Sequence, residues 1–405
     1  MTLLDEKFER LATDDAPGQE VRQRSGDLSA FMIGRRLPGV PVDFSHGDVD
    51  AFEPAPGAID VFVRGVQLGG KRAYTEYRGD ADLRQDVAAK LTRFTGAAVS
   101  ASDSLIVTPG TQGALFLAIA STVASGDKVA IVRPDYFANQ KLVEFFGGVI
   151  VPVGLAYLGT NSDAGIDLSG LEDAFKVGAK VFVFSNPNNP TGAVYGEAEI
   201  EAIARLAGRY GVTVIVDQLY SRMIFDGRHY AHLHAADIEP GRIVTIIGPS
   251  KTESLSGYRV GVAFGSPAIV TRMEKLQAIV SLRAAGYSQS VLQTWFSEPA
   301  GWMDERIRLH QAIRDDLHTR FAAIDGVNVL RPRGGSYLFP QLPRLSVPYA
   351  DFVRILRHQA AVTVTPGTEF SPACGNCIRL NFSQAHGPAV HAVERIIELI
   401  ERYRS

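Results

Sequence analysis

The sequence predicts an α/β fold with a mostly parallel sheet, followed by a smaller α+β part. Short apolar runs, typical of buried strands, occur at residues 105–108, 128–132, 180–184, 213–216 and 242–247. Segments with helical spacing lie between them, and strands that alternate with helices form parallel sheets covered on both faces. Near the C-terminus, residues 335–339 and 378–382 instead alternate like half-exposed strands.

The predicted helices are read from apolar spacing. Residues 114–123 form an apolar helical run directly after the first strand and a glycine turn. In residues 197–210 the apolar side chains recur every three or four positions, so they share one face of a helix. Residues 389–403 have the same spacing and close the chain. The last helix and the two alternating strands together predict the smaller α+β part.

The length and net charge of the chain limit the classes of protein to which it can belong. A chain of 405 residues exceeds what one core usually holds, so we expect an N-terminal segment 1–50 within a small domain, a large domain 51–290 and a C-terminal small domain 291–405. The formal net charge of −3 gives no attraction to nucleic acid or to an anionic membrane. Two cysteines and an N-terminus without a signal-peptide pattern predict a cytoplasmic protein without a disulfide framework.

Polar side chains and a glycine turn follow the predicted strands. Ligands of open α/β sheets bind beyond the carboxyl ends of the strands. The residues found there, in chain order, are Gly110, Thr111, Asn189, Asp217, Tyr220 and Lys251. The sequence therefore gathers a helix start, an amide, a carboxylate, a phenol and an amine at one edge of the sheet.

This set of groups fits one ligand, pyridoxal 5′-phosphate (PLP). A lysine amine can hold the aldehyde covalently and later move a proton. A buried carboxylate can pair with the pyridine nitrogen, and an amide and a phenol can hydrogen-bond the 3′ oxygen. A helix N-terminus and an arginine can bind the phosphate dianion. The strand ends therefore predict a PLP enzyme.

Six short motifs occur in one order along nearly the whole chain. They are Tyr74-Thr-Glu-Tyr-Arg-Gly79, Pro134-Asp-Tyr136, Asn186-Pro-Asn-Asn-Pro-Thr-Gly192, Asp217-x-x-Tyr220, Ser250-Lys-Thr252 with Arg259, and Ile378-Arg-Leu380. This order and spacing resembles the class I and II aminotransferases of PLP fold type I. The resemblance implies a large domain with a mostly parallel seven-stranded sheet, a small domain built from both chain ends, and transfer of an amino group from an L-amino acid to a 2-oxo acid.

The resemblance assigns roles around the cofactor ring. Lys251 would hold the aldehyde and act as general acid and base, and Asp217 would pair with the ring nitrogen. Asn189 and Tyr220 would bond the 3′ oxygen, and Tyr136 would stack on the ring.

The resemblance also assigns the phosphate and substrate contacts. The residues implied around the phosphate are Gly110, Thr111, Gln112, Ser250 and Arg259, with Tyr74 from the other subunit of a homodimer. Arg379 would take the substrate α-carboxylate, since a planar guanidinium suits bidentate binding. Gly47 would lie over the substrate.

Two positions depart from the family pattern. Gly248 stands where the family usually has a phosphate-binding serine, and Thr111 could compensate for the lost hydroxyl. Glu253 stands where an apolar residue is common, and it is either a surface feature or an influence on the pKa of Lys251. These departures keep a PLP-dependent lyase, cyclase or oxidase open as an alternative. We expect no metal site, and a loop coincidence is a better interpretation of Cys374-Gly-Asn-Cys377 than a redox pair.

The substrate class depends on Arg283. The segment 281–288 resembles, with a one-residue difference, the one from which dicarboxylate-specific members supply a side-chain arginine to the partner subunit. A second guanidinium opposite Arg379 would clamp both ends of aspartate or glutamate. The alternative is a solvated arginine at a helix end beside a C-terminal Gly286.

Overall fold

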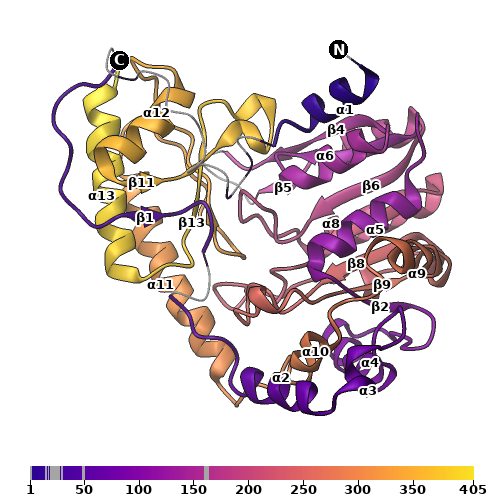
Figure 1. Ribbon diagram of the computed structural model, residues 1–405. Helices are drawn as coiled ribbons and strands as arrows, with labels where there is room; N and C mark the ends of the chain where they lie inside the picture. Colours follow the sequence, from indigo (N-terminus) through magenta and orange to yellow (C-terminus); the bar gives the residue numbers. More distant parts are fainter. Residues whose placement is uncertain are drawn as a thin grey trace.

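A large twisted sheet with helices on both faces forms one body of the molecule, and a smaller body stands beside it (Figure 1). The computed structural model describes residues 2–13, 16, 18, 28, 31–47, 51–158 and 164–405. None of the helices within these ranges is long and apolar enough to cross a membrane.

The large sheet has eight strands in the described part of the chain. In spatial order they are β2 (Leu105–Thr108), β9 (Gly261–Gly265), β8 (Ile243–Ile247), β7 (Thr213–Asp217), β6 (Ala179–Ser185), β3 (Lys128–Arg133), β4 (Val149–Ala156) and β5 (Gly165–Ile166). The five strands from β8 to β4 pair in parallel, while β9 and the two edge strands pair antiparallel. The expected α/β class is confirmed, but the strand count of seven is wrong, because the two-residue β5 extends one edge.

Alternation along the central strands explains why both faces of the sheet are covered. In β6, Val181 and Val183 pack into one apolar layer, while Phe182 and Phe184 pack into the layer on the opposite face. Successive side chains of a strand point to opposite faces, so an uninterrupted apolar run forms two cores at once. The strand runs identified from the sequence lie in these buried strands.

The helices have the following bounds. They are α1 (Leu3–Leu11), α2 (Ala58–Gln67), α3 (Gly70–Ala73), α4 (Ala81–Thr95), α5 (Gly110–Thr122), α6 (Phe137–Phe145), α7 (Leu168–Lys176), α8 (Glu197–Tyr210), α9 (Pro267–Val280), α10 (Gly286–Gln289), α11 (Trp302–Ala322), α12 (Tyr349–Ile355) and α13 (His386–Tyr403). Helices α5, α6 and α9 cover one face of the sheet, and α7 and α8 cover the other. Helix α5 begins immediately beyond β2, which sets its N-terminus at the edge of the sheet.

The smaller body combines the C-terminal part of the chain with a segment near its start. Its strands are β10 (Tyr337–Leu338), β13 (Ile378–Asn381) and β12 (Thr365–Pro366) in one sheet, and β1 (Val42–Asp43) paired in parallel with β11 (Val362–Thr363) in another. The expectation of half-exposed strands here is wrong. Strands β10 and β13 are buried on both faces. Leu338, Ile378 and Leu380 pack into a core with α11, α12 and α13, while Tyr337 and Arg379 on the other face contact Tyr220 and Asn189 of the large body.

Candidate active site

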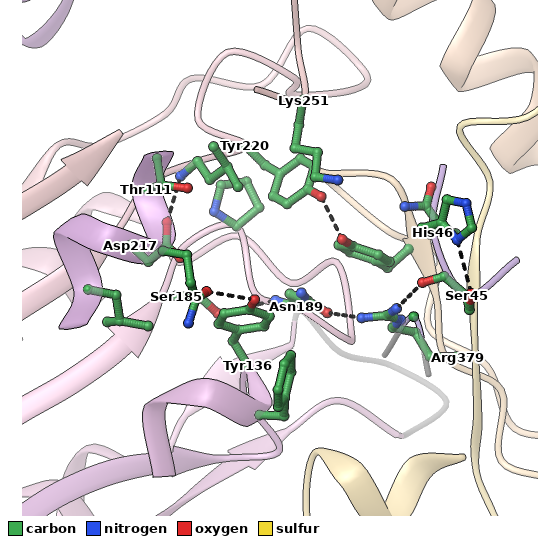
Figure 2. A pocket seen from close by; sticks show the side chains of 18 residues that line it. Ser45, His46, Thr111, Tyr136, Ser185, Asn189, Asp217, Tyr220, Lys251 and Arg379 are labelled. Atoms are coloured by element: carbon green, nitrogen blue, oxygen red, sulfur yellow. Dashed lines mark hydrogen bonds between the residues drawn. The ribbon is translucent and has the colours of Figure 1, made fainter. Parts of the chain in front are cut away.

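A pocket opens between the carboxyl ends of the large sheet and the smaller body. The residues predicted from the sequence that line it are Thr111, Gln112, Tyr136, Asn189, Asp217, Tyr220, Lys251 and Arg379. They come from five places in the large body, the starts of α5 and α6 and the ends of β6, β7 and β8, and from β13 of the smaller body. Figure 2 shows their side chains gathered around one cavity.

Lys251 lies in the turn that follows β8. The flanking Ser250 and Thr252 are buried, while Lys251 is half-buried and lines the pocket. A backbone bond from the Ser254 N–H to the Lys251 carbonyl (3.3 Å) closes the turn. The amine is therefore carried by a short, tightly packed turn at the edge of the sheet.

The interpretation of Glu253 as a surface feature is wrong. Its side chain is fully buried and forms an ion pair with Arg222, whose guanidinium also binds Glu298 at 2.8 Å. Thr252 donates a hydrogen bond to the same carboxylate. Burial raises the pKa of Glu253, and Arg222 opposes that rise. This cluster joins the Lys251 turn to the turn that follows Tyr220.

Asp217 is the last residue of β7, and its carboxylate lines the pocket. One oxygen accepts a hydrogen bond from the backbone N–H of Leu219 at 3.0 Å. Burial raises the pKa of Asp217 to about 6. A carboxylate with one protein donor and a desolvation penalty is suited to a cationic partner.

Three phenols line the cavity, and burial shifts the pKa of two of them, Tyr220 and Tyr136. The hydroxyl groups of Tyr220 and Tyr337 are hydrogen-bonded at 2.6 Å, and burial holds the pKa of Tyr220 well above its ordinary value. Tyr136 donates to Gln112 at 3.0 Å, and burial also raises its pKa. Both phenols are therefore neutral hydrogen-bonding groups at physiological pH.

The start of α5 faces Arg259. Gly110 has a φ of +74°, a conformation that favours glycine, and a Cβ atom built on it would lie 2.6 Å from a guanidinium nitrogen of Arg259. The N-cap residue of α5, Pro109, makes no side-chain capping hydrogen bond. The hydroxyl of Ser250 is buried without a hydrogen-bond partner in the described protein. At Gly248, an added Cβ would lie 2.9 Å from the methyl group of Thr111, so that threonine fills the space a larger residue would take.

Arg379 lies on β13, and only 2% of it is exposed, which excludes a surface arginine. Its Nη1 donates to Oδ1 of Asn189 at 3.2 Å, and its Nη2 donates to the Ser45 carbonyl at 2.6 Å (Figure 2). Its guanidinium lies 4.5 Å from the ring centre of Tyr337. The Nε atom is buried and has no partner in the described protein.

Six predicted residues do not line the pocket: Gly110, Ser250 and Arg259, described above, and Gly47, Tyr74 and Arg283. Gly47 packs against Asn381, where an added Cβ would lie 2.5 Å from Oδ1. Tyr74 is 79% exposed. Arg283 donates to the Thr75 carbonyl at 2.5 Å, and its guanidinium lies 5.2 Å from the Tyr74 ring centre. Gly286 begins α10 and does not end a helix, so the helix-end interpretation of Arg283 is wrong.

Several lining residues escaped the sequence reasoning. They are Ser45, His46, Ser185, Leu219, Tyr337 and Asn381. Ser185 ends β6, so the strand-end rule that found Asp217 also applies to it. Tyr337 lies within a segment predicted as a strand, but nothing marked its tyrosine as functional. No local pattern marks Ser45 and His46.

The comparisons agree with this geometry. Residues 42–396 match the family model described as aminotransferase class I and II. The chain is 61% identical to a solved aspartate aminotransferase from Rhodobacter sphaeroides, with a TM-score of 0.96 over 99% of this chain and all of the other. It is 29% identical to the aspartate/prephenate aminotransferase of Thermus thermophilus over 96% of this chain and 95% of the relative. It is 27% identical to the arginine–pyruvate transaminase of Pseudomonas aeruginosa, again over 96% and 95%.

These relatives all transfer amino groups, so the alternative of a lyase, cyclase or oxidase is not favoured. The family match covers most of the chain, and the solved relative covers nearly all of it. The chain therefore belongs to the class I and II aminotransferases, a family of PLP-dependent enzymes, and is itself a transaminase.

Proposed function

We propose that the chain binds PLP in the pocket at the carboxyl edge of the large sheet and transfers the amino group of a dicarboxylic amino acid to a 2-oxo acid. The observation that carries the proposal is the meeting of Lys251, Asp217 and Arg379 around one cavity. We also propose the division into segment 1–50, large domain 51–290 and small domain 291–405. The pairing of β1 with β11 supports it, whereas α1 packs against α6 of the large body. The free thiols of Cys374 and Cys377 support a reducing, cytoplasmic location.

The residues present fit PLP. A dianionic phosphate suits the uncapped start of α5, the guanidinium of Arg259 and the buried hydroxyl of Ser250 that lacks a partner. Thr111 and Gln112 line the same end of the pocket. The ring nitrogen would face Asp217, and Tyr136 would cover the ring. When bound, PLP supplies an aldehyde that takes up the amino group and an electron-withdrawing ring that stabilises charge at Cα.

The protein's own groups then divide the work. Lys251 holds the cofactor through its amine and afterwards moves the proton of the substrate Cα. Asp217 keeps a proton on the ring nitrogen, and Tyr220 and Asn189 donate to the ring oxygen. Arg379 binds the α-carboxylate and so fixes the Cα–H bond near the lysine. Its unpartnered Nε leaves a donor for that carboxylate.

A second copy of the chain would complete the site. Helix α2 exposes Ile59, Val63 and Val66 along one side, a spacing of four and three residues. Other exposed apolar residues of this region are Leu68, Tyr74, Tyr77, Ile279, Val280 and Leu282. Arg283 and Tyr74 lie together within this apolar face. We propose that the face is the homodimer interface and that it carries these two residues to the partner's pocket.

Substituting Ile279 by glutamate tests the dimer. Ile279 is 81% exposed in the single chain, so the change disturbs no packing within it, whereas a dimer would have to bury the new charge. We expect the dissociation constant of the dimer to rise at least about tenfold, with activity lost in proportion to the monomer formed. Light scattering across a concentration series measures both states.

The matched control is Val177→Glu, which adds the same charge at an exposed residue following α7. It should leave the dimer unchanged. A wild-type monomer with full activity would contradict the shared-site proposal.

The substrate class is tested by a panel of amino donors on wild type and Arg283→Ala. Aspartate and glutamate should react with higher kcat/KM than alanine and leucine, because a buried arginine–carboxylate pair is made only with a dicarboxylate. Arg283→Ala should lower kcat/KM for the acidic donors about 100-fold and leave alanine nearly unchanged. The 61% identical aspartate aminotransferase supports this choice.

Arg272→Ala, at an exposed arginine of α9, is the control for loss of a positive charge. If all donors lose rate equally in Arg283→Ala, the dicarboxylate assignment fails and the transaminase assignment stands.

A further inference from the structure

A second carboxylate, Asp135, is buried beside the pocket and has no part in the mechanism above. Only 2% of it is exposed. Its Oδ2 accepts the backbone N–H of Ser185 at 2.9 Å. Its Oδ1 accepts the Ser185 hydroxyl, the backbone N–H of Tyr136 at 2.5 Å and the side-chain amide of Asn139 at 3.4 Å. All four of these hydrogen bonds are donated to the carboxylate.

A continuous line of hydrogen bonds leads from Asp135 to the substrate arginine. The hydroxyl of Ser185 donates to Asp135 and accepts the backbone N–H of Asn189 at 3.2 Å. The side-chain oxygen of Asn189 then accepts Nη1 of Arg379 at 3.2 Å (Figure 2). Three elements that are far apart in the sequence are therefore joined in a fixed order.

The backbone of Asp135 provides a second connection to the same arginine. Its N–H donates to the Phe370 carbonyl at 3.4 Å. The ring centre of Phe370 lies 4.8 Å from the guanidinium of Arg379. The guanidinium is thus held at its edge through Asn189 and against its face by Phe370, and both routes start at one residue.

We propose that Asp135 is a positioning residue. Asp135 holds Arg379 through Ser185 and Asn189, and so orients the guanidinium that binds the substrate carboxylate. The proposal rests on the proposed role of Arg379. Asp135 touches neither the reacting atoms nor the cavity, so its effect reaches the substrate through the orientation of the guanidinium. Such an arrangement keeps the flexible arginine in its binding orientation before the substrate arrives.

The charge on Asp135 matters because of what surrounds it. Burial and the nearby Asp217 raise the pKa of Asp135, whereas the donors from Ser185 and Tyr136 lower it and favour the ionised carboxylate. In Asp135→Asn an NH₂ group replaces one oxygen and would face donors only. The substitution should therefore release Ser185 while changing the volume of the side chain very little.

Ligand affinity tests the proposal without requiring turnover. The probe is 2-methylaspartate, which has an α-carboxylate but no hydrogen on Cα, titrated into the cofactor-loaded protein by calorimetry. Asp135→Asn and Ser185→Ala should each raise its Kd about tenfold. The Kd of the double variant should be no higher than that of the single variant that binds the probe less tightly. Both substitutions interrupt the same series of hydrogen bonds from Asp135 to Arg379, so their effects should not add. In steady-state assays Asp135→Asn should raise KM about tenfold and change kcat less than about threefold.

Controls separate this proposal from the proposed function. Asp127→Asn removes a carboxylate just before β3 that pairs with Lys180, and it should leave the Kd unchanged. If Arg379→Ala binds the probe as well as wild type, the carboxylate assignment fails and this proposal fails with it. If Arg379→Ala weakens binding of the probe while Asp135→Asn and Ser185→Ala do not, only the positioning role of Asp135 is overturned. The same holds if the effects of Asp135→Asn and Ser185→Ala on the Kd add in the double variant. Should Asp135→Asn not fold, the affinity of Ser185→Ala decides the same link.

Discussion

Replacing Lys251 by alanine is expected to lower kcat by at least about four orders of magnitude. The residue supplies the amine that holds the cofactor and the base that moves the Cα proton, and the variant loses both. No other lysine lines the described pocket, so no neighbouring amine is available to substitute for it. The purified variant should also lose the visible absorption of covalently held PLP. Borohydride reduction and peptide mass spectrometry should find the cofactor attached to Lys251 in the wild type and to no residue in the variant.

Lys275→Ala is the matched control, because Lys275 is an exposed lysine of α9. It should keep the absorption and the activity of the wild type. Wild-type turnover in Lys251→Ala would overturn the assignment of the catalytic lysine and with it the proposed cofactor site.

The sequence alone was sufficient for the side chains that end parallel strands. Buried strands are uninterrupted apolar runs, and the first polar residue after such a run stands at the edge of the sheet. Asp217 is such a residue, and Lys251 follows its strand after a short Gly-Pro-Ser turn; the structure brings both to one pocket. The helix start at Gly110 was found in the same way, since a glycine turn directly follows a strand.

Contacts between distant segments could not be predicted in this way. Arg379 is held by Asn189 and by the carbonyl of Ser45, which lie 190 and 334 residues away in the chain. The burial of Glu253 depends on Arg222 and Glu298, and no local pattern around Glu253 reveals those partners. The strands of the smaller body read as half-exposed because polar side chains alternate with apolar ones. On the polar face, Tyr337 and Arg379 contact Tyr220 and Asn189 of the large body, which are remote in sequence.

Replacing Asp217 by asparagine is expected to lower kcat about 10²- to 10³-fold, because the neutral amide cannot hold a proton on the ring nitrogen in a water-poor site. The change keeps the size of the side chain and its acceptor for the Leu219 N–H, so the fold should be retained. The affinity for PLP should fall as well, since a buried charge partner is lost. Stopped-flow spectra of the first half-reaction measure the rate, and equilibrium dialysis measures the affinity.

The same carboxylate predicts how cofactor stabilisation depends on pH. Burial raises the pKa of Asp217 from its ordinary 3.8 to about 6 in the unloaded protein. Above about pH 6 the unloaded fold therefore carries an ionised carboxylate that pairs with no cation among the described residues. A bound pyridinium ring removes that penalty. The increase in Tm on adding PLP should therefore be largest above pH 6 and should diminish as the pH falls through about 6. The cofactor phosphate also titrates near pH 6 and contributes to the same pH dependence. In Asp217→Asn only the contribution of the phosphate remains, so the variant measures that contribution separately. An identical pH dependence in the wild type and in Asp217→Asn would show that Asp217 does not pair with the ring.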